Sequence, residues 1–341
     1  MLSFIARRAA FIPVVLAGLS FLIFGLLQFL TPEMRASLYV KDPRQLAQIE
    51  DVIRTYHLDD PIHTQYWAWL KEVLKGNLGW SETAKMPVAE AIKTFFPATF
   101  ELTTISFALT FIIGIWLGTI SAVNKDKMID HVSRFIAITG TSLPIFVIGL
   151  GLLMIFYGKF GIFPPGRASF STQLLISGNE FTAYTGLLTI DGILNWNFDV
   201  VIDALKHLVL PITALTYVEI AILLRVTRSS MLEELGKDYV RTARAKGLPE
   251  SVVRNKHARK NALIPVITIS SILFVALLSG VAVTETVFDY PGIGKWGITA
   301  AQQFDIPGVM GFGGLSAILF VIGNTVADIL YAAIDPRIRI Q

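Results

Sequence analysis

The 341-residue sequence contains no cysteine, so neither disulfide bonds nor thiolate metal sites can stabilise the protein. It also contains little charge. Asp, Glu, Lys and Arg make up only 16% of the chain, whereas soluble domains carry roughly 25%. Hydrophobic residues make up 53%, and the mean hydropathy is +0.59. The composition excludes an ordinary soluble protein and indicates a single integral membrane bundle.

The sequence also lacks the short motifs of common enzyme classes. No GxxxxGK(S/T) loop is present, so the chain cannot hold ATP phosphates in the usual way. No HExxH motif is present, and the five histidines lack the spacing of metal ligands. We therefore expect a protein that is not an enzyme, with no catalytic residue and no metal or cofactor of its own. Any energy from ATP must come from a partner.

Long apolar runs, by contrast, recur along the whole chain. About 20 residues at 1.5 Å rise per residue cross the hydrocarbon core of a bilayer, so these runs predict an all-α membrane fold with six transmembrane helices. Pro144 is expected to kink the third, because proline removes a backbone donor. The run behind Arg7 and Arg8 is too long for the core of a signal peptide and is interpreted as an anchor. The predicted spans are 9–30, 97–123, 135–160, 205–224, 263–287 and 309–334.

Basic residues in the connectors predict the orientation. The segment 225–260 has ten Lys or Arg against four acids, and the N-terminus, the connector 124–134 and the C-terminal tail are also basic. With six spans all four lie on one side, which the positive-inside rule makes cytoplasmic. Both termini are then cytoplasmic, in a multi-pass protein of the cell membrane. The same loops explain the net charge of +3 better than a nucleic-acid partner does.

These spans divide the chain into three parts. Residues 1–30 are the N-terminus and first helix, 31–95 a long extracytoplasmic cap, and 96–341 a core that includes the basic loop 229–262. Apolar residues at helical spacing predict short amphipathic helices within the cap at 43–56 and 63–74. We expect the cap to be folded.

Two acidic residues and two glycine motifs lie in or near the spans. Glu219 and Asp328 fall within predicted spans, where a charge costs roughly 2.5 to 3.5 kcal/mol. For Glu219 a role in a translocation pathway and a structural hydrogen bond both stay open, whereas Asp328 is interpreted as structural. The GxxxG pair Gly114 and Gly118 either marks a helix interface or matches by chance. The GxGxxG motif at 292–297 follows a span rather than a strand, so we expect a tight turn and a re-entrant or capping helix there, not a nucleotide site.

The basic loop has its own helical pattern. Good helix formers run from Tyr239 to Lys246, Gly247 suits a C-terminal cap, and Pro249 can begin a second helix. Two short helices meeting at Gly247 would form a compact knob that a partner can grip. The alternative is a loop lying on anionic lipid headgroups.

The segment 239–247, together with 261–265, resembles the EAA loop of ABC importer permeases in the dipeptide, oligopeptide and nickel family. Arg241, Thr242 and Ala243 stand where the general pattern begins Glu-Ala-Ala, and 31–34 lacks the Gly-Asp-Pro of many relatives. Other patches of this family recur along nearly the whole chain, at 56–61 with 65–66, 76–79, 207–211, 291–294 and 335–337.

The resemblance implies the partners. A homologous second permease would complete the pathway, two cytoplasmic ATPases would bind ATP and Mg, and an extracytoplasmic binding protein would deliver a short peptide, an oligosaccharide or a nickel or other metal chelate. The knob would seat in a groove of one ATPase, whose closure switches the pore from inward-facing to outward-facing. The implied coupling residues are Tyr239, Arg241, Thr242, Ala243, Arg244, Ala245, Lys246, Gly247, Leu248 and Pro249.

Two further hypotheses remain. The outer location of the cap suggests that it docks the binding protein, and a secondary transporter using Glu219 is the alternative from another functional class. The candidate docking residues are Tyr56, His57, Asp59, Tyr66 and Trp67.

Overall fold

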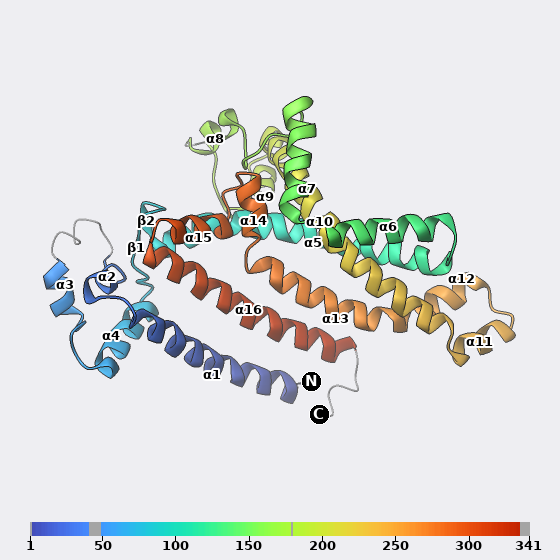
Figure 1. Cartoon of the computed structure of the whole chain (residues 1–341), viewed down its shortest axis with the longest axis horizontal. Helices are drawn as coiled ribbons and strands as arrows, with labels where there is room; N and C mark the ends of the chain where they lie inside the picture. Colours follow the sequence, from blue (N-terminus) through green and yellow to red (C-terminus); the bar gives the residue numbers. More distant parts are fainter. Residues whose placement is uncertain (1, 41–48, 179, 335–341) are drawn as a thin grey trace.

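The computed structural model describes residues 2–40, 49–178 and 180–334, and in these parts the chain is almost entirely helical (Figure 1). The strands there are β1 (Trp80–Ser81) and β2 (Met86–Pro87), which pair antiparallel. The α-helices are α1 (Leu2–Leu27), α2 (Pro32–Ala36), α3 (Ile49–Thr55), α4 (Ile62–Leu74), α5 (Val88–Val123), α6 (Met128–Ser142), α7 (Ile145–Leu152), α8 (Phe170–Ile176), α9 (Leu188–Leu194), α10 (Phe198–Leu235), α11 (Asp238–Ala245), α12 (Glu250–Val252), α13 (Arg259–Leu278), α14 (Ala282–Val287), α15 (Ile293–Gln302) and α16 (Ile306–Ile334). The π-helical segments are η2 (Leu153–Lys159) and η3 (Val253–Ala258).

Four helices of the described chain are long and apolar enough to cross a membrane: α5, α10, the continuous helix Glu250–Leu278, and α16 over Ile306–Ala327. The pair α6 and α7–η2 is a fifth candidate if its two halves form one broken span. In α1 the residues Ile12–Leu27 form a shorter apolar helix. The predicted all-α membrane fold is therefore confirmed at the level of four to five spans.

Helices α5 and α10 form the centre of the bundle and run in the same direction. The hydroxyl of Thr216 lies 3.4 Å from the carbonyl of Ser106, and further along a Cβ on Gly118 would lie 2.5 Å from the Cβ of Thr227. A Cβ on Gly114 would lie 3.0 Å from the Cβ of Leu223. The absence of side chains at the two glycines lets the backbones approach, so the GxxxG motif marks a helix interface.

The third and fifth predicted spans differ from the structure. The connector before α6 is only 124–127, and after Ser142 the chain turns by 104° into α7 instead of continuing as one kinked helix. Leu143 is extended and Pro144 has no N–H to donate, so the helix ends there. The fifth span ends at Leu278 rather than 287, because Gly280 has a positive φ of 114° and α14 is a separate short helix.

The cap is a small folded unit packed on the end of α1. Leu58 and Trp69 are buried against Phe24 and Leu27, and Arg35 donates a hydrogen bond to Gln28 at 2.9 Å. The predicted helix 63–74 is confirmed as α4, and the predicted helix 43–56 as α3, although 43–48 lie outside the described residues.

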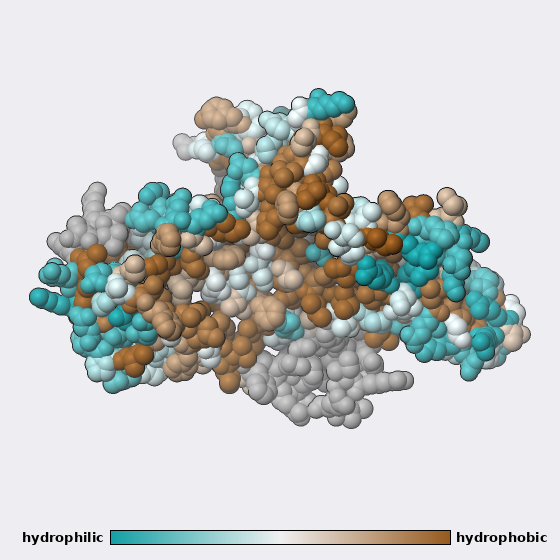
Figure 2. Space-filling model, viewed as in Figure 1, coloured by the Kyte–Doolittle hydropathy of each residue, from teal (hydrophilic) through white to brown (hydrophobic). Residues whose placement is uncertain are grey.

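Figures 1 and 2 show where polar surface gathers. Hydrophilic side chains cover the cap helices at one end of the long axis and the region of α11 and α12 at the other, and hydrophobic residues dominate between them. The cap and the basic loop thus lie at opposite ends of the hydrophobic bundle.

Candidate functional site

The predicted knob is present and is built around Gly247. Helix α11 ends at Ala245, and Gly247 follows with a φ of 74°, a conformation that favours glycine. Its N–H donates to the Arg244 carbonyl at 2.9 Å, and the Leu248 N–H donates to the Ala243 carbonyl. The predicted first helix and glycine cap are confirmed.

The second helix of the knob is not short, contrary to the prediction. Pro249 is the N-cap of α12, and the helix continues through η3 into α13 without interruption, from Glu250 to Leu278. The sequence suggested a short helix because Arg254, Lys256 and Arg259 made 250–260 too polar for a span. As one helix, however, it connects the knob directly to the bundle, so a displacement of the knob moves α13.

One face of α11 anchors the knob to the bundle. Val240 is fully buried and Ala243 is 5% exposed, and they cluster with Ala122 of α5 and Met231 of α10. The methyl group of Ala243 therefore packs inside the protein and is not accessible to a partner, contrary to its predicted place on the contact surface.

The other predicted coupling residues form the outward face. Arg244 spans the Gly247 turn to Glu250, with Nε and Oε1 2.7 Å apart, and Arg241 lies 3.5 Å from Asp238. These pairs are open to solvent, where ion pairs contribute little. The exposed residues are Tyr239, Arg241, Thr242, Arg244, Ala245, Lys246, Gly247, Leu248 and Pro249.

Tyr239 ties the knob to both neighbouring helices. Its hydroxyl donates to a carboxylate oxygen of Glu234 on α10 and accepts a hydrogen bond from Asn261 Nδ2 of α13 at 3.1 Å. Partial burial raises the pKa of Tyr239, and the hydrogen bond to Glu234 raises it further. The phenol therefore stays protonated at neutral pH, and its main role is to hold the base of the knob.

A buried ion pair that the sequence did not reveal lies behind the knob. Asp130 of α6 is fully buried, and its carboxylate accepts hydrogen bonds from Arg228 of α10 at 2.6 and 2.8 Å. Ser121 of α5 donates to the same carboxylate at 2.5 Å. Three helices thus meet at one side chain. In the sequence both charges looked like ordinary members of basic connectors, so no local signal identified the pair.

Glu219 lies on α10, about one turn from Thr216, which contacts Ser106, and about one turn from Leu223, which packs on Gly114. Its side chain is partly buried, and its Oε2 atom is inaccessible and has no hydrogen-bond partner among the described residues. A structural hydrogen bond at Oε2 is therefore absent from this conformation. The side chain of Asp328 lies outside the described residues, as does the 335–337 patch.

The GxGxxG motif binds a carboxylate of its own chain. Glu285 of α14 is fully buried and accepts hydrogen bonds from Thr99 Oγ1 at 2.5 Å and from the Lys295 N–H at 2.7 Å. A Cβ on Gly292 would lie 2.2 Å from the Glu285 carboxyl carbon, so only glycine leaves room. Free N–H groups at a helix start favour an anion, and here that anion is Glu285. The predicted turn and helix are confirmed as α15.

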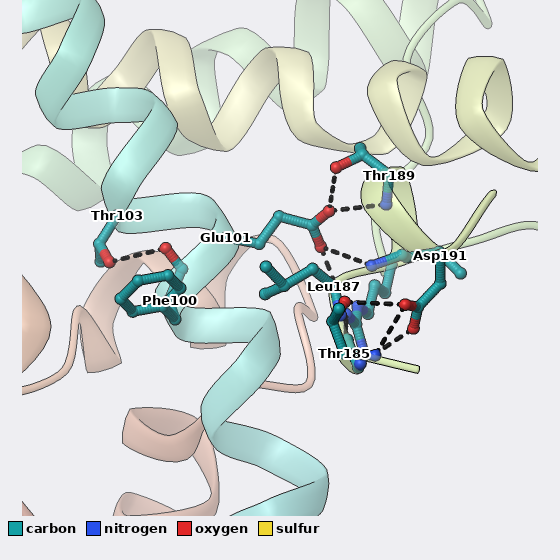
Figure 3. Close-up of polar contacts among 10 residues, drawn as sticks. Phe100, Glu101, Thr103, Thr185, Leu187, Thr189 and Asp191 are labelled. Carbon is teal, nitrogen blue, oxygen red and sulfur yellow. Dashed lines mark hydrogen bonds and ion pairs between the residues drawn. The ribbon is translucent and has the colours of Figure 1, made fainter. Parts of the chain in front are cut away.

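A third buried carboxylate, that of Glu101, fixes α9 to α5 (Figure 3). Glu101 accepts hydrogen bonds from the backbone N–H groups of Leu188 and Thr189 at 3.2 and 2.8 Å and from the Thr189 hydroxyl at 2.6 Å. Arg167 lies 3.3 Å from the same carboxylate. The carboxylates of Glu285 and Glu101 are both occupied by hydrogen bonds within the protein. No group of three His, Asp or Glu residues suited to a metal occurs in the described chain.

The five candidate docking residues all lie on the cap but differ in accessibility. His57, Asp59 and Trp67 are exposed, and Trp67 is 66% exposed. Tyr56 is half-buried and Tyr66 is buried. The exposed three form the part of the set that a partner can reach.

Tyr66 instead joins the cap to α1. Its ring stacks on Phe21 with centroids 4.4 Å apart and meets Phe24 edge-on, and its hydroxyl is 2.8 Å from Ser20 Oγ. A direct contact with a docking partner is thus unavailable to Tyr66 in this structure.

A bundle of hydrophobic helices that carries an exposed basic knob between two of its spans has the architecture of a transporter permease subunit. Residues 114–340 match the family of the binding-protein-dependent transport system inner membrane component, and residues 1–103 match its N-terminal region. The chain belongs to this family. It is therefore a multi-pass permease of the inner membrane and not an enzyme, and it works with a substrate-binding protein and an ATPase.

Curated relatives cover essentially the whole chain. It is 39% identical to the probable D,D-dipeptide transport system permease protein DdpB of Escherichia coli (strain K12), over 98% of this chain and 97% of the relative. It is 38% identical to the di/tripeptide transport system permease protein DppB of Pseudomonas aeruginosa (strain UCBPP-PA14), over the full length of both. It is 36% identical to the oligopeptide transport system permease protein AppB of Bacillus subtilis (strain 168), over 99% of this chain and 100% of the relative.

Proposed function

We propose that this chain forms half of the translocation pathway for short peptides in an ABC importer, with a homologous permease as the other half. The names of the relatives support the substrate class, since they refer to D,D-dipeptides, di- and tripeptides, and oligopeptides. Oligosaccharides or a nickel or other metal chelate are the alternative cargoes within the same architecture. ATP and Mg are bound by the partner ATPases.

We further propose six spans with both termini in the cytoplasm. In this arrangement α1 is the first span and the bent pair α6 and α7–η2 is the third. The parallel packing of α5 and α10 supports the topology, because the second and fourth spans of a six-span chain must run in the same direction. The separation of cap and knob to opposite ends also agrees with it. In this topology 1–30, 31–95 and 96–341 are the anchor, the extracytoplasmic cap and the permease core.

The observation that carries the proposal is the construction of the knob. Its outward face is accessible, its inward face is anchored by Val240 and Ala243, and its second helix is the beginning of the span Glu250–Leu278. An ATPase that grips the exposed face in one nucleotide state and shifts it in another therefore moves a pathway helix. Such differential contact is what a conformational switch requires.

Gly247 offers the sharpest test. In the assembled transporter, Gly247→Val should abolish ATP-driven peptide uptake while the chain still inserts and assembles, because valine cannot hold the positive φ. Gly247→Asn is the matched control: asparagine adds a side chain but tolerates this conformation, and a Cβ meets no atom within 4 Å. Uptake at the wild-type level by a folded Gly247→Val transporter would contradict the proposal.

The cap is proposed to dock the substrate-binding protein through His57, Asp59 and Trp67, which are accessible. Trp67→Ala should weaken capture of the binding protein in a pull-down. Tyr39, which is buried in the cap, gives a comparison variant, since Tyr39→Phe preserves the outer surface. Equal capture by both variants would remove Trp67 from the docking surface.

The alternative of a secondary transporter using Glu219 does not agree with the family to which the chain belongs. The unpartnered Oε2 atom leaves Glu219 as a candidate residue of the translocation pathway. Glu219→Gln should then lower ATP-driven uptake, and uptake at the wild-type level would remove Glu219 from the pathway.

A further inference from the structure

A cavity of about 310 Å³ lies beside the knob, between the end of α5 and the helix that begins at Glu250. It is separate from the outward face of the knob, because none of the exposed coupling residues lines it. Its walls are Trp116, Thr119, Ile120, Val123, Asn124, Arg254, Asn255 and Arg259.

The polar side of this cavity carries two arginines and no carboxylate. Arg254 and Arg259 both line it, and no carboxylate of the described chain pairs with either guanidinium. Among the described residues, the Nε–H of Arg259 is inaccessible to solvent and has no hydrogen-bond partner, and the Thr119 hydroxyl is likewise unpartnered. Arg254 Nε donates to Asn255 Oδ1 at 3.4 Å. Unpaired buried donors are costly, so two arginines here favour an anion.

The other side of the cavity is apolar and lies at the end of a span. Ile120 and Val123 are in the last turn of α5, and Trp116 is 57% exposed one turn earlier. Indole rings are enriched where a membrane meets water. The cavity thus lies at the end of a candidate membrane span, with one apolar wall and one wall that carries the two arginines.

We propose that this cavity binds the phosphate group of an anionic phospholipid from the leaflet next to the knob. Guanidinium groups bind phosphate through paired, charge-assisted hydrogen bonds, and basic pockets between membrane helices are suited to anionic lipid headgroups. The wall formed by Trp116, Ile120 and Val123 selects a lipid over a free phosphate ion, because it offers the start of an acyl chain an apolar surface.

The location gives the lipid an influence on coupling. Arg254 lies in η3 and Arg259 begins α13, so both belong to the helix that connects the knob to the bundle, whereas Trp116 and Val123 belong to α5. A lipid whose phosphate is held by both arginines and whose acyl chain lies against Trp116 contacts both elements. This consequence rests on the proposed function, whereas lipid binding itself does not.

Native mass spectrometry of the full-length chain with equimolar dioleoyl phosphatidylglycerol and phosphatidylcholine tests the site. The wild-type chain should retain phosphatidylglycerol preferentially, by roughly 25-fold, since each arginine near an anionic lipid contributes about fivefold. The variant Arg254→Gln/Arg259→Gln should lose this preference. The control Lys256→Gln/Lys260→Gln should keep it, because it removes the same charge from neighbouring exposed positions that do not line the cavity.

Each arm can overturn the proposal. Equal retention of the two lipids by the wild-type chain would by itself exclude selective binding of anionic lipid. Persistence of the preference in the arginine variant would place the lipid elsewhere. In thermal unfolding, stabilisation by inorganic phosphate as large as that by phosphatidylglycerol would show that free phosphate is the ligand. Loss of peptide uptake with normal lipid retention would separate a failure of coupling from a failure of lipid binding.

Discussion

The knob at one end of the bundle and the α14–α15 turn at the other both depend on glycine, for opposite physical reasons. Gly247 has a positive φ, and a Cβ there would meet nothing within 4 Å. Gly292 has an ordinary φ of −97°, but a Cβ would collide with the Glu285 carboxylate. Gly247 is needed for its backbone conformation, and its surroundings stay open. Gly292 is needed because it has no side chain, which leaves room for the buried Glu285 carboxylate.

This difference indicates how the two ends respond to force. Around Glu285 the helices α5, α14 and α15 are joined through a side chain without solvent access, so the elements move together. The outward face of the knob is held by exposed ion pairs and by Tyr239. Because these contacts are open to solvent, a partner can bind there and replace them. Behind the knob, the bundle contains a buried ion pair between Asp130 and Arg228.

The largest expected effect concerns this buried pair. Asp130→Ala should lower the free energy of unfolding by about 3 to 5 kcal/mol, because it leaves the Arg228 guanidinium without its partner in a poorly solvated site. Thermal unfolding in detergent measures the change. Asp238→Ala, which breaks the exposed pair with Arg241, is the matched control and should cost less than about 1 kcal/mol. Equal losses of unfolding free energy in the two variants would show that the buried pair contributes no more to stability than the exposed pair.

The next largest effect should occur at the other end. Gly292→Ala should cost about 1 to 3 kcal/mol, the usual range for overpacking a filled site, since the methyl group displaces Glu285 from Thr99 or from the α15 backbone. Gly313→Ala in α16 is the control, because a Cβ there meets no atom within 4 Å. A Gly292→Ala protein that unfolds at the wild-type temperature would contradict the tight packing around Glu285.

Much of this comparison was accessible from the sequence. The helix over 239–246, the turn at Gly247 and the helix after Gly292 all follow from local rules, because each depends on neighbouring residues. The partners of Glu285 and Asp130 are distant in the chain: Thr99 and Arg228 reach them only after the bundle forms. For the same reason the sequence could not distinguish buried Ala243 from exposed Ala245, which are two residues apart on one helix.

The bend between α6 and α7 shows another limit. Pro144 indicates an interruption of the helix, but proline permits both a mild kink and a complete turn. Contacts far from Pro144 decide between them. A Cβ on Gly149 of α7 would lie 3.0 Å from Val287 and 3.2 Å from Phe288, and these contacts fix α7 at an angle to α6. A window of sequence around the proline contains neither residue.

A smaller loss of stability is expected at Gly247 itself. Gly247→Ala should cost roughly 1 to 2 kcal/mol, the penalty of an L-residue in the left-handed region, with no contribution from crowding. Gly247→Asn should cost less, because asparagine visits this region more readily. Thermal unfolding of the two variants, with Gly236→Ala at an ordinary negative φ as control, measures the backbone contribution. Equal losses in Gly247→Ala and Gly247→Asn would point to steric crowding instead.

The smallest expected effect separates the surface of the knob from its framework. Arg244 and Glu250 flank the Gly247 turn, but their side chains are 43% and 70% exposed. Arg244→Gln should therefore change the free energy of unfolding by no more than about 0.5 kcal/mol, and a double-mutant cycle with Glu250→Gln should give a coupling energy that falls with added salt. A coupling energy above roughly 1 kcal/mol would mean that the ion pair, rather than the glycine and the buried face of α11, determines the shape of the knob. A small value would leave Arg244 free to exchange Glu250 for an acidic group on the ATPase without weakening the fold.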